Sequence, residues 1–113
     1  MRKTLGLAVL AAALACGTAS AQQVNVKIGV LTDMSSLYSD IGGPGSVAAA
    51  KLAIADFTKA NPNVKVELIS GDHQNKPDVG SQIANQWYDV EKVDLIIDTP
   101  NSGVALAVTE TMR

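Results

Sequence analysis

The chain has 113 residues, with nine basic and eleven acidic side chains and a formal net charge of −2. Its Lys and Arg residues form no cluster, and this balance argues against nucleic acid and against an anionic membrane surface as partners. The single cysteine, Cys16, excludes an internal disulfide, so burial of apolar side chains must stabilise the fold.

The N-terminus has the pattern of a secretion signal. Arg2 and Lys3 provide its positive charge, an apolar run follows at residues 5–15, and Ala-Ser-Ala at residues 19–21 fits a cleavage site. The apolar run is shorter than the roughly 20 residues that a membrane-spanning helix needs. We therefore expect a cleaved signal peptide at residues 1–21. Lipoprotein processing at Cys16 and a retained membrane anchor are the alternatives.

Residues 22–113 would then carry seven basic and eleven acidic side chains, a net charge of −4, and no cysteine. About 90 residues are enough for one small domain. Residues 102–113, however, stop in a helical pattern without a glycine or proline to end it, and would leave carbonyl groups and an apolar stripe open. We expect residues 22–113 to be an incomplete part of a longer protein.

The first predicted elements are a strand at residues 26–32, which are apolar and rich in β-branched side chains, and a helix at residues 45–60. A long loop at residues 33–43 separates them. Pro44 suits the first turn of the helix, where its missing N–H costs nothing. Apolar positions recur at helical spacing and would pack on a sheet: Val47, Ala50, Ile54 and Phe57.

A second strand is expected at residues 65–70, and a second helix begins at Pro77 after a polar loop at residues 71–76. Asn-Pro-Asn at residues 61–63 ends the preceding helix. Val79, Ile83 and Trp87 lie on one face of the second helix, which predicts a core position for Trp87.

The third pair is a buried strand within residues 93–99 and a helix that begins at Ser102. Val104, Val108 and Met112 form the apolar side of this helix. The order βαβαβα with short connections predicts an α/β fold in three layers, a parallel sheet with helices on both faces.

Parallel sheets of this kind bind ligands beyond the carboxyl ends of their strands. The loop at residues 100–102 leads straight into the third helix, whose first N–H groups are free and whose dipole favours negative charge. Asn101 and Ser102 are both suited to cap this helix, and Ser102 brings a hydroxyl beside the free N–H groups. The pattern predicts a site for a small anionic solute, and simple capping is the equally open alternative.

The loop at residues 33–43 is longer than the roughly 2–6 residues usual between a strand and a helix. It combines hydroxyl groups with Leu37, Tyr38 and Ile41, which is typical of the wall of a ligand pocket. Tyr38 is the better candidate, since its ring and hydroxyl can serve both an apolar ligand and water. The alternative for Leu37 and Ile41 is that they fold back on the core beneath the loop.

Two further patterns resemble a cofactor site and a metal site, but neither has the spacing or the partners that such a site needs. Residues 43–48, Gly-Pro-Gly-Ser-Val-Ala, match the dinucleotide fingerprint G-x-G-x-x-A, which must follow its strand directly. Here about ten residues intervene, and Pro44 removes an N–H. His73 is the only histidine, and Asp72 alone is a poor partner for a metal site. We expect His73 to be solvated or to stabilise its loop, and we expect no catalytic residue, no metal and no cofactor.

Three segments carry a resemblance to a known family. They are Lys-Ile-Gly-Val-Leu-Thr-Asp-Met-Ser-Ser at residues 27–36 with a glycine at 42, Ala-Ala-Lys-Leu-Ala-Ile-Ala-Asp-Phe at residues 49–57, and Asn-Ser-Gly-Val-Ala-Leu-Ala at residues 101–107. From Val26 onward, the chain resembles the N-terminal lobe of the leucine/isoleucine/valine-binding proteins, periplasmic solute-binding proteins of branched-chain amino acid ABC transporters.

The resemblance implies a type I periplasmic binding protein fold, in which two α/β lobes close on the solute and the first lobe holds it while open. It also implies a role for individual residues. Ser102 would receive the solute carboxylate through its hydroxyl and N–H, beside Asn101 and Gly103, and Ile41 would lie near the solute side chain. Ser36-Leu37 replaces the family's usual Gly-Pro, which resembles the branch whose solutes include aromatic acids and other small carboxylates.

The expected protein is therefore a non-enzymatic, periplasmic solute-binding component of an ABC importer. Its partners would be a small carboxylate, either an amino acid or an aromatic or other organic acid, and a permease in the inner membrane. The ligand-binding candidates are Ser102, Asn101, Gly103, Tyr38 and Ile41. A periplasmic sensor domain of the same fold is the alternative, and a dinucleotide-binding enzyme is a remote one.

Overall fold

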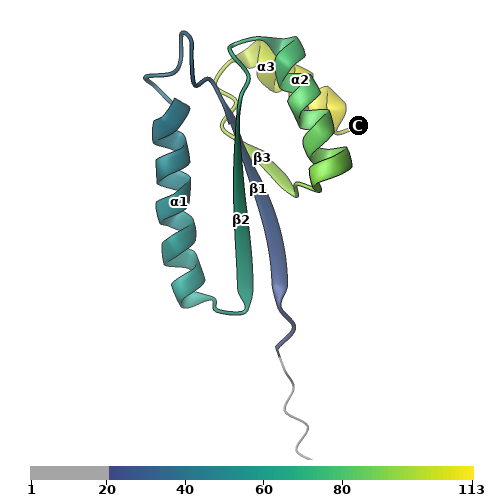
Figure 1. Cartoon of the computed structure of the whole chain (residues 1–113). Coiled ribbons are helices and arrows are strands. Elements are labelled where there is room, and N and C mark those ends of the chain that lie inside the picture. Colours follow the sequence, from purple (N-terminus) through teal and green to yellow (C-terminus); the bar gives the residue numbers. More distant parts are fainter. Residues whose placement is uncertain (1–20) are drawn as a thin grey trace, which may run out of the picture.

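The computed structural model describes residues 21–113, which form one parallel sheet and the helices around it (Figure 1). The predicted signal peptide, with Cys16, lies outside the described residues except for Ala21. The elements are β1 (Val24–Thr32), α1 (Gly43–Ala60), β2 (Val64–Asp72), α2 (Pro77–Gln86), a π-helical turn η1 (Trp87–Glu91), β3 (Leu95–Ile97) and α3 (Ser102–Thr111).

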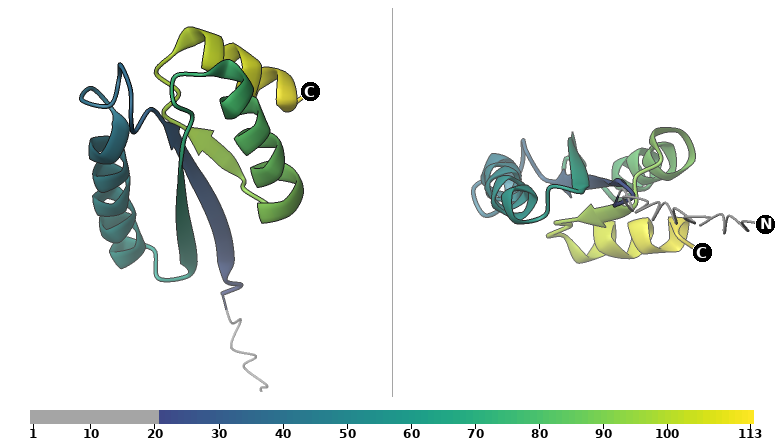
Figure 2. Two further views of the ribbon diagram at one scale, coloured as in Figure 1. Left: turned by 45° about the horizontal axis from the view of Figure 1, so that its top comes forward. Right: turned by 90° about the horizontal axis from the view of Figure 1, so that it is seen from below.

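The strands lie in the order β2-β1-β3, so β1 is central. It pairs with β2 over nine residues, from Val24↔Val64 to Thr32↔Asp72, but with β3 only over Ile28↔Leu95 to Val30↔Ile97. Because the chain crosses β1 between β2 and β3, α1 and α2 lie on opposite faces of the sheet. Figure 2 shows α1 on one face and α2 with α3 on the other. This confirms the predicted three-layer α/β fold and the βαβαβα order.

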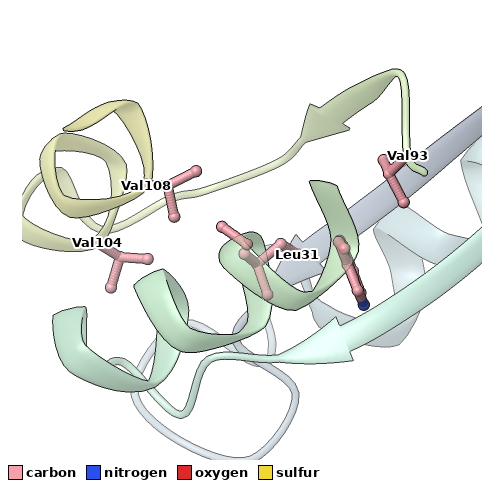
Figure 3. Packing of buried hydrophobic residues seen from close by; sticks show 6 residues of the cluster. Leu31, Val93, Val104 and Val108 are labelled. Atoms are coloured by element: carbon pink, nitrogen blue, oxygen red, sulfur yellow. The ribbon is translucent and has the colours of Figure 1, made fainter. Parts of the chain in front are cut away.

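The main core lies between the sheet and the α2–α3 pair (Figure 3). Trp87 is buried there, as the helical spacing predicts. Its indole lies directly against the sheet because Gly29 of β1 and Gly71 of β2 have no side chain. A Cβ at Gly29 would collide with the ring, and one at Gly71 would lie 2.9 Å from Trp87 Cζ2. The core cluster consists of Leu31, Ala84, Trp87, Val93, Val104 and Val108.

Helix α1 covers its face of the sheet less closely. Apolar side chains from α1, β1 and β2 leave an apolar cavity of about 330 Å³ between them, and Phe57 is 48% exposed. This cavity lies toward the amino ends of the strands, away from the loops that lead into the helices. Its lining consists of Val26, Ile28, Ala53, Ile54, Phe57, Val64 and Val66.

Backbone conformation explains where two elements end. The third strand is shorter than the sequence predicts because Asp98, at φ 64°, adopts the left-handed conformation directly after Ile97. Helix α2 continues into η1, which the sequence did not predict. This turn ends at Lys92, also left-handed at φ 56°. None of the helices in residues 21–113 combines the length and apolar character needed to cross a membrane.

Candidate functional site

Three loops meet at the carboxyl ends of the strands, at the top of Figure 1. They comprise residues 33–42 after β1, 73–76 after β2 and 98–101 after β3. The backbone N–H of His73 donates to the carbonyl of Thr32 at 2.9 Å, and Nδ2 of Asn101 donates to Oδ1 of Asn75. The β2–α2 loop therefore connects with both of its neighbours.

The β1–α1 loop folds around the buried carboxylate of Asp33. Oδ1 accepts from Ser36 N at 2.8 Å and Ser35 N at 3.3 Å, and Oδ2 accepts from Ser36 Oγ at 2.6 Å and Tyr38 N at 2.9 Å. Burial alone would raise the pKa of Asp33, but these donors outweigh it and lower that pKa to about 2. Asp33 is therefore ionised, and both of its carboxylate oxygens accept hydrogen bonds from its own loop.

Asp72, the last residue of β2, supports the same loop from outside. Oδ1 accepts from Met34 N at 2.9 Å and Gln74 N at 2.8 Å, and Oδ2 accepts from Ser35 Oγ at 2.6 Å. Burial raises the pKa of Asp72, as does the nearby charge of Asp33, but the hydrogen bonds prevail and the pKa is lowered. Sequence reasoning missed this role of both acids. The available signal was an Asp followed by serines, typical of side-chain turns.

His73 is fully buried, so the prediction that it is solvated was wrong. The alternative prediction is confirmed, since Nδ1 accepts from the N–H of Asn75 at 2.9 Å and thereby stabilises the loop. An accepting Nδ1 requires the neutral ring with its proton on Nε2, which has no partner in the described part of the chain. Burial lowers the pKa of His73 against the opposing charges of Asp33, Asp72 and Asp98.

The β3–α3 loop leaves the N-terminus of α3 open. Asn101 is the cap, because its Oδ1 accepts from Val104 N at 2.9 Å and its carbonyl accepts from Ala105 N at 2.8 Å. The N–H groups of Ser102 and Gly103 have no protein partner within residues 21–113. Ser102 is exposed and does not cap the helix, so its hydroxyl is free to bind a ligand beside them.

Gly103 lies beside Pro77, the first residue of α2. A Cβ at this position would be 3.1 Å from Oδ1 of Asn101 and 3.3 Å from Cγ of Pro77, tighter than ordinary contact. Gly103 therefore protects the geometry of the cap as well as offering its own N–H.

The structure does not bring all five candidates into one cluster. Ile41 and Leu37 are 79% and 73% exposed, so the alternative in which they fold back on the core is wrong. Tyr38 is half-buried, and its carbonyl accepts from Ile41 N and Gly42 N at 3.0 Å. No hydrogen bond joins the Tyr38 side chain to Ser102, Asn101 or Gly103 in the described residues. The apolar cavity under α1 is lined by none of the five.

The two patterns set aside in the sequence lack the geometry of a cofactor site. Ten residues, 33–42, separate β1 from α1, and the N–H of Gly43 is taken by Thr32 Oγ1 at 3.1 Å. The Gly43 to Ala48 segment therefore offers no phosphate cradle directly after a strand. Across residues 21–113, no three His, Cys, Asp or Glu side chains are grouped so that they could hold a metal ion.

Comparison with known proteins decides the family. The sequence model of the family described as "Periplasmic binding protein" matches residues 25–113. The chain belongs to this family. Its sheet and helices form part of one lobe of the type I periplasmic binding protein fold. A search of curated proteins gives no significant match.

Solved structures support the same assignment. A periplasmic ligand-binding protein of a branched-chain amino acid ABC transporter from Burkholderia xenovorans is 50% identical, with a TM-score of 0.69 over 75% of this chain and 23% of that one. A periplasmic binding protein from Burkholderia mallei is 40% identical, with a TM-score of 0.69 over 77% of this chain and 23% of that one. This chain therefore spans less than a quarter of the length of these relatives.

A more distant protein shares the fold. It is an ABC transporter solute-binding protein from R. palustris in complex with benzoate, which is 21% identical with a TM-score of 0.60. The match covers 79% of this chain and 24% of that one.

Proposed function

We propose that the full-length protein is the extracytoplasmic solute-binding component of an ABC importer, and that residues 22–113 belong to its N-terminal lobe. The solute would be a small molecule with a carboxylate, either an amino acid or an aromatic or other organic acid. Family membership supports the transport role. An inner-membrane permease would be the protein partner, and residues 1–21 would be the signal peptide that directs export.

The observation that carries the carboxylate is the open start of α3. The N–H groups of Ser102 and Gly103 have no partner in the described residues, and an unused hydroxyl lies beside them. A carboxylate there would accept these three donors and interact favourably with the helix dipole. Asn101 takes the next N–H, that of Val104, so the cap leaves the first two for the ligand.

Tyr38 and Ile41 would supply the apolar side of the same site. They belong to a loop whose backbone is held by Asp33, and the side chain of Ile41 is largely exposed. An exposed aliphatic side chain on a well-braced loop suits contact with the apolar part of a solute. The two loops leave the neighbouring strands β1 and β3 at the same end of the sheet, and we propose that one solute contacts both.

The test is a matched panel of ligands against the full-length protein, measured by isothermal titration calorimetry. Leucine and benzoate are the acidic probes, chosen from the transporter type of the B. xenovorans relative and the ligand of the R. palustris protein. Leucinamide and benzamide are their neutral controls. We expect at least one acid to bind at least about tenfold more tightly than its amide, the strength of a hydrogen bond to a charged group. Equal affinity for acid and amide would contradict the proposed carboxylate site.

A further inference from the structure

The β2–α2 loop contributes a residue to this site that the sequence did not single out. Asn75 is half-buried and adopts the left-handed conformation at φ 58°, directly after Gln74 at φ 53°. Its N–H donates to the buried Nδ1 of His73, and its Oδ1 accepts from Nδ2 of Asn101. One short side chain therefore joins the β2–α2 loop to the cap of α3, 26 residues later in the chain.

The bond from Asn101 to Asn75 fixes which way the capping amide points. An asparagine amide has an accepting end and a donating end, and only the accepting end can cap a helix. In this structure the donating end is held by Asn75, so Oδ1 is held toward Val104 N. Without Asn75, the amide would be free to rotate, and its oxygen would leave Val104 or approach the N–H groups that the ligand needs.

The surroundings leave the cap little room for another arrangement. A Cβ at Gly103 would already lie 3.1 Å from Asn101 Oδ1, which shows how closely that oxygen sits to the first turn of α3. On the other side, Asn75 is itself held by the buried ring of His73. The oxygen is therefore positioned from the β2–α2 loop and not by α3 alone.

We propose that Asn75 is a positioning residue of the carboxylate site: it orients the Asn101 cap and so keeps the N–H groups of Ser102 and Gly103 open to the ligand. This inference rests on the proposed function. It assigns to Asn75 no contact with the ligand. It predicts a larger loss of affinity for a carboxylate than for its amide, because a charged acceptor gains more from those N–H groups than a neutral one.

The test compares Asn75→Gly with Gln74→Gly in the full-length protein. Both positions are left-handed, so glycine relieves the backbone equally, but only Asn75 holds the cap. Using the acid that wild type binds and its amide, we expect Asn75→Gly to weaken the acid roughly fivefold, the strength of a neutral hydrogen bond, and Gln74→Gly to leave it unchanged. A purely structural role would weaken acid and amide alike, and that result would overturn the proposal.

A double-mutant cycle tests the bridge itself. Asn101→Ser keeps a capping oxygen but has no amide to donate to Asn75. If the bridge carries the effect, Asn75→Gly costs less than about twofold in this background, whereas equal losses in both backgrounds would overturn the proposal. Hydrogen exchange at the Val104 amide, measured without ligand, should also become faster in Asn75→Gly. Unchanged exchange at Val104 would contradict the proposed orientation of the cap.

The wild-type measurement separates the two possible failures. If wild type does not prefer acid over amide, the proposed carboxylate site is wrong, and the role of Asn75 fails with it. If wild type shows the preference and Asn75→Gly retains it in full, the carboxylate site stands and only the role of Asn75 is refuted.

Discussion

The β1–α1 loop and the β3–α3 loop leave the same edge of the sheet, but they use their backbone N–H groups in opposite ways. In the β1–α1 loop, the N–H groups of Ser35, Ser36 and Tyr38 all donate to Asp33, and that of Met34 donates to Asp72. In the β3–α3 loop, the N–H groups of Ser102 and Gly103 have no partner in the described residues.

The difference shows which loop can recognise an anion. The four N–H groups of Met34, Ser35, Ser36 and Tyr38 are already used by Asp33 and Asp72, and the charges of these two acids would repel a third carboxylate. A helix start with two free N–H groups and a free hydroxyl has the opposite character. The β1–α1 loop is then suited to shape the site and the β3–α3 loop to hold the charged group.

Removing the carboxylate of Asp33 tests whether the β1–α1 loop depends on the hydrogen bonds that its N–H groups donate, and it should have the largest effect. Asp33→Ala would leave three N–H groups and the Ser36 hydroxyl without their acceptor. We expect the largest loss of stability in the series, a fall in Tm of about 5 °C or more by calorimetry. Asp40→Ala, an exposed acid in the same loop, is the matched control and should leave the Tm unchanged. A stable Asp33→Ala protein would mean that the loop does not depend on this carboxylate.

Ser102→Ala should have the converse effect, a loss of binding without a loss of stability. The hydroxyl makes no hydrogen bond that caps α3, so the helix loses nothing. A lost bond to a carboxylate costs roughly 1.5–3 kcal/mol, which weakens binding by about tenfold or more. Titration calorimetry should show this loss for the acid and much less for its amide. Ser102→Gly should bind as weakly as Ser102→Ala, and restored affinity in Ser102→Gly would mean that the hydroxyl does not hold the ligand.

Asn101→Ala should lower both properties by smaller amounts. Alanine cannot accept from Val104 N, and loss of a helix cap typically costs about 1 kcal/mol of stability. Binding should weaken as well, because the first turn of α3 loses the group that orders it. Urea unfolding and ligand titration on the same preparation would check both effects. Asn101→Asp restores the capping oxygen and should recover stability without affinity, since its charge repels a carboxylate. Full recovery of affinity would refute an anionic ligand at this position.

The sequence predicts the framework well because its signals are local. Pro44 and Pro77 mark the starts of α1 and α2, since proline is favoured in the first turn of a helix, and both lie there. Helical spacing places Trp87 in the core, although the glycines that receive its ring lie on two other elements. The sequence also predicts the open N-terminus of α3, because a short loop leads from an apolar strand to Asn101 and Ser102 at the start of a helical pattern.

The interior of the loop junction could not be predicted in the same way. His73 looks like a surface residue because its neighbours are polar, yet it is fully buried, and Gly80 of α2 lies close to its Cβ. Its bond to Asn75 depends on a left-handed backbone, which an asparagine permits but does not require. Ile41 looks apolar enough for a core, but the turn around Asp33 leaves it exposed. The His73–Asn75 bond and the turn around Asp33 are local loop geometries that these residue types permit but do not dictate, whereas the burial of His73 depends on packing against α2.

Titration of His73 gives the smallest and most selective test of this junction. Burial lowers the pKa of His73 from its ordinary value of 6.5, so the unfolded chain binds a proton more readily than the folded protein. Stability should therefore be complete above about pH 6.5 and fall as the pH drops below it, by less than the one-proton limit of about 1.4 kcal/mol per pH unit. Asp33 and Asp72 affect stability in a different pH range. Because their pKa values are lowered from 3.8, protonating them destabilises the fold only as the pH falls below about 3.8.

The variant that isolates this effect is His73→Asn, whose Oδ1 can accept from Asn75 N in place of Nδ1 but cannot take up a proton. Urea unfolding at several pH values between 5 and 8 should give a sloping stability for wild type and a flatter one for His73→Asn. The variant will lose some packing, but that loss is the same at every pH and leaves the slope as the measure. If both proteins show the same slope, His73 is not the group that links the buried junction of the three loops to pH.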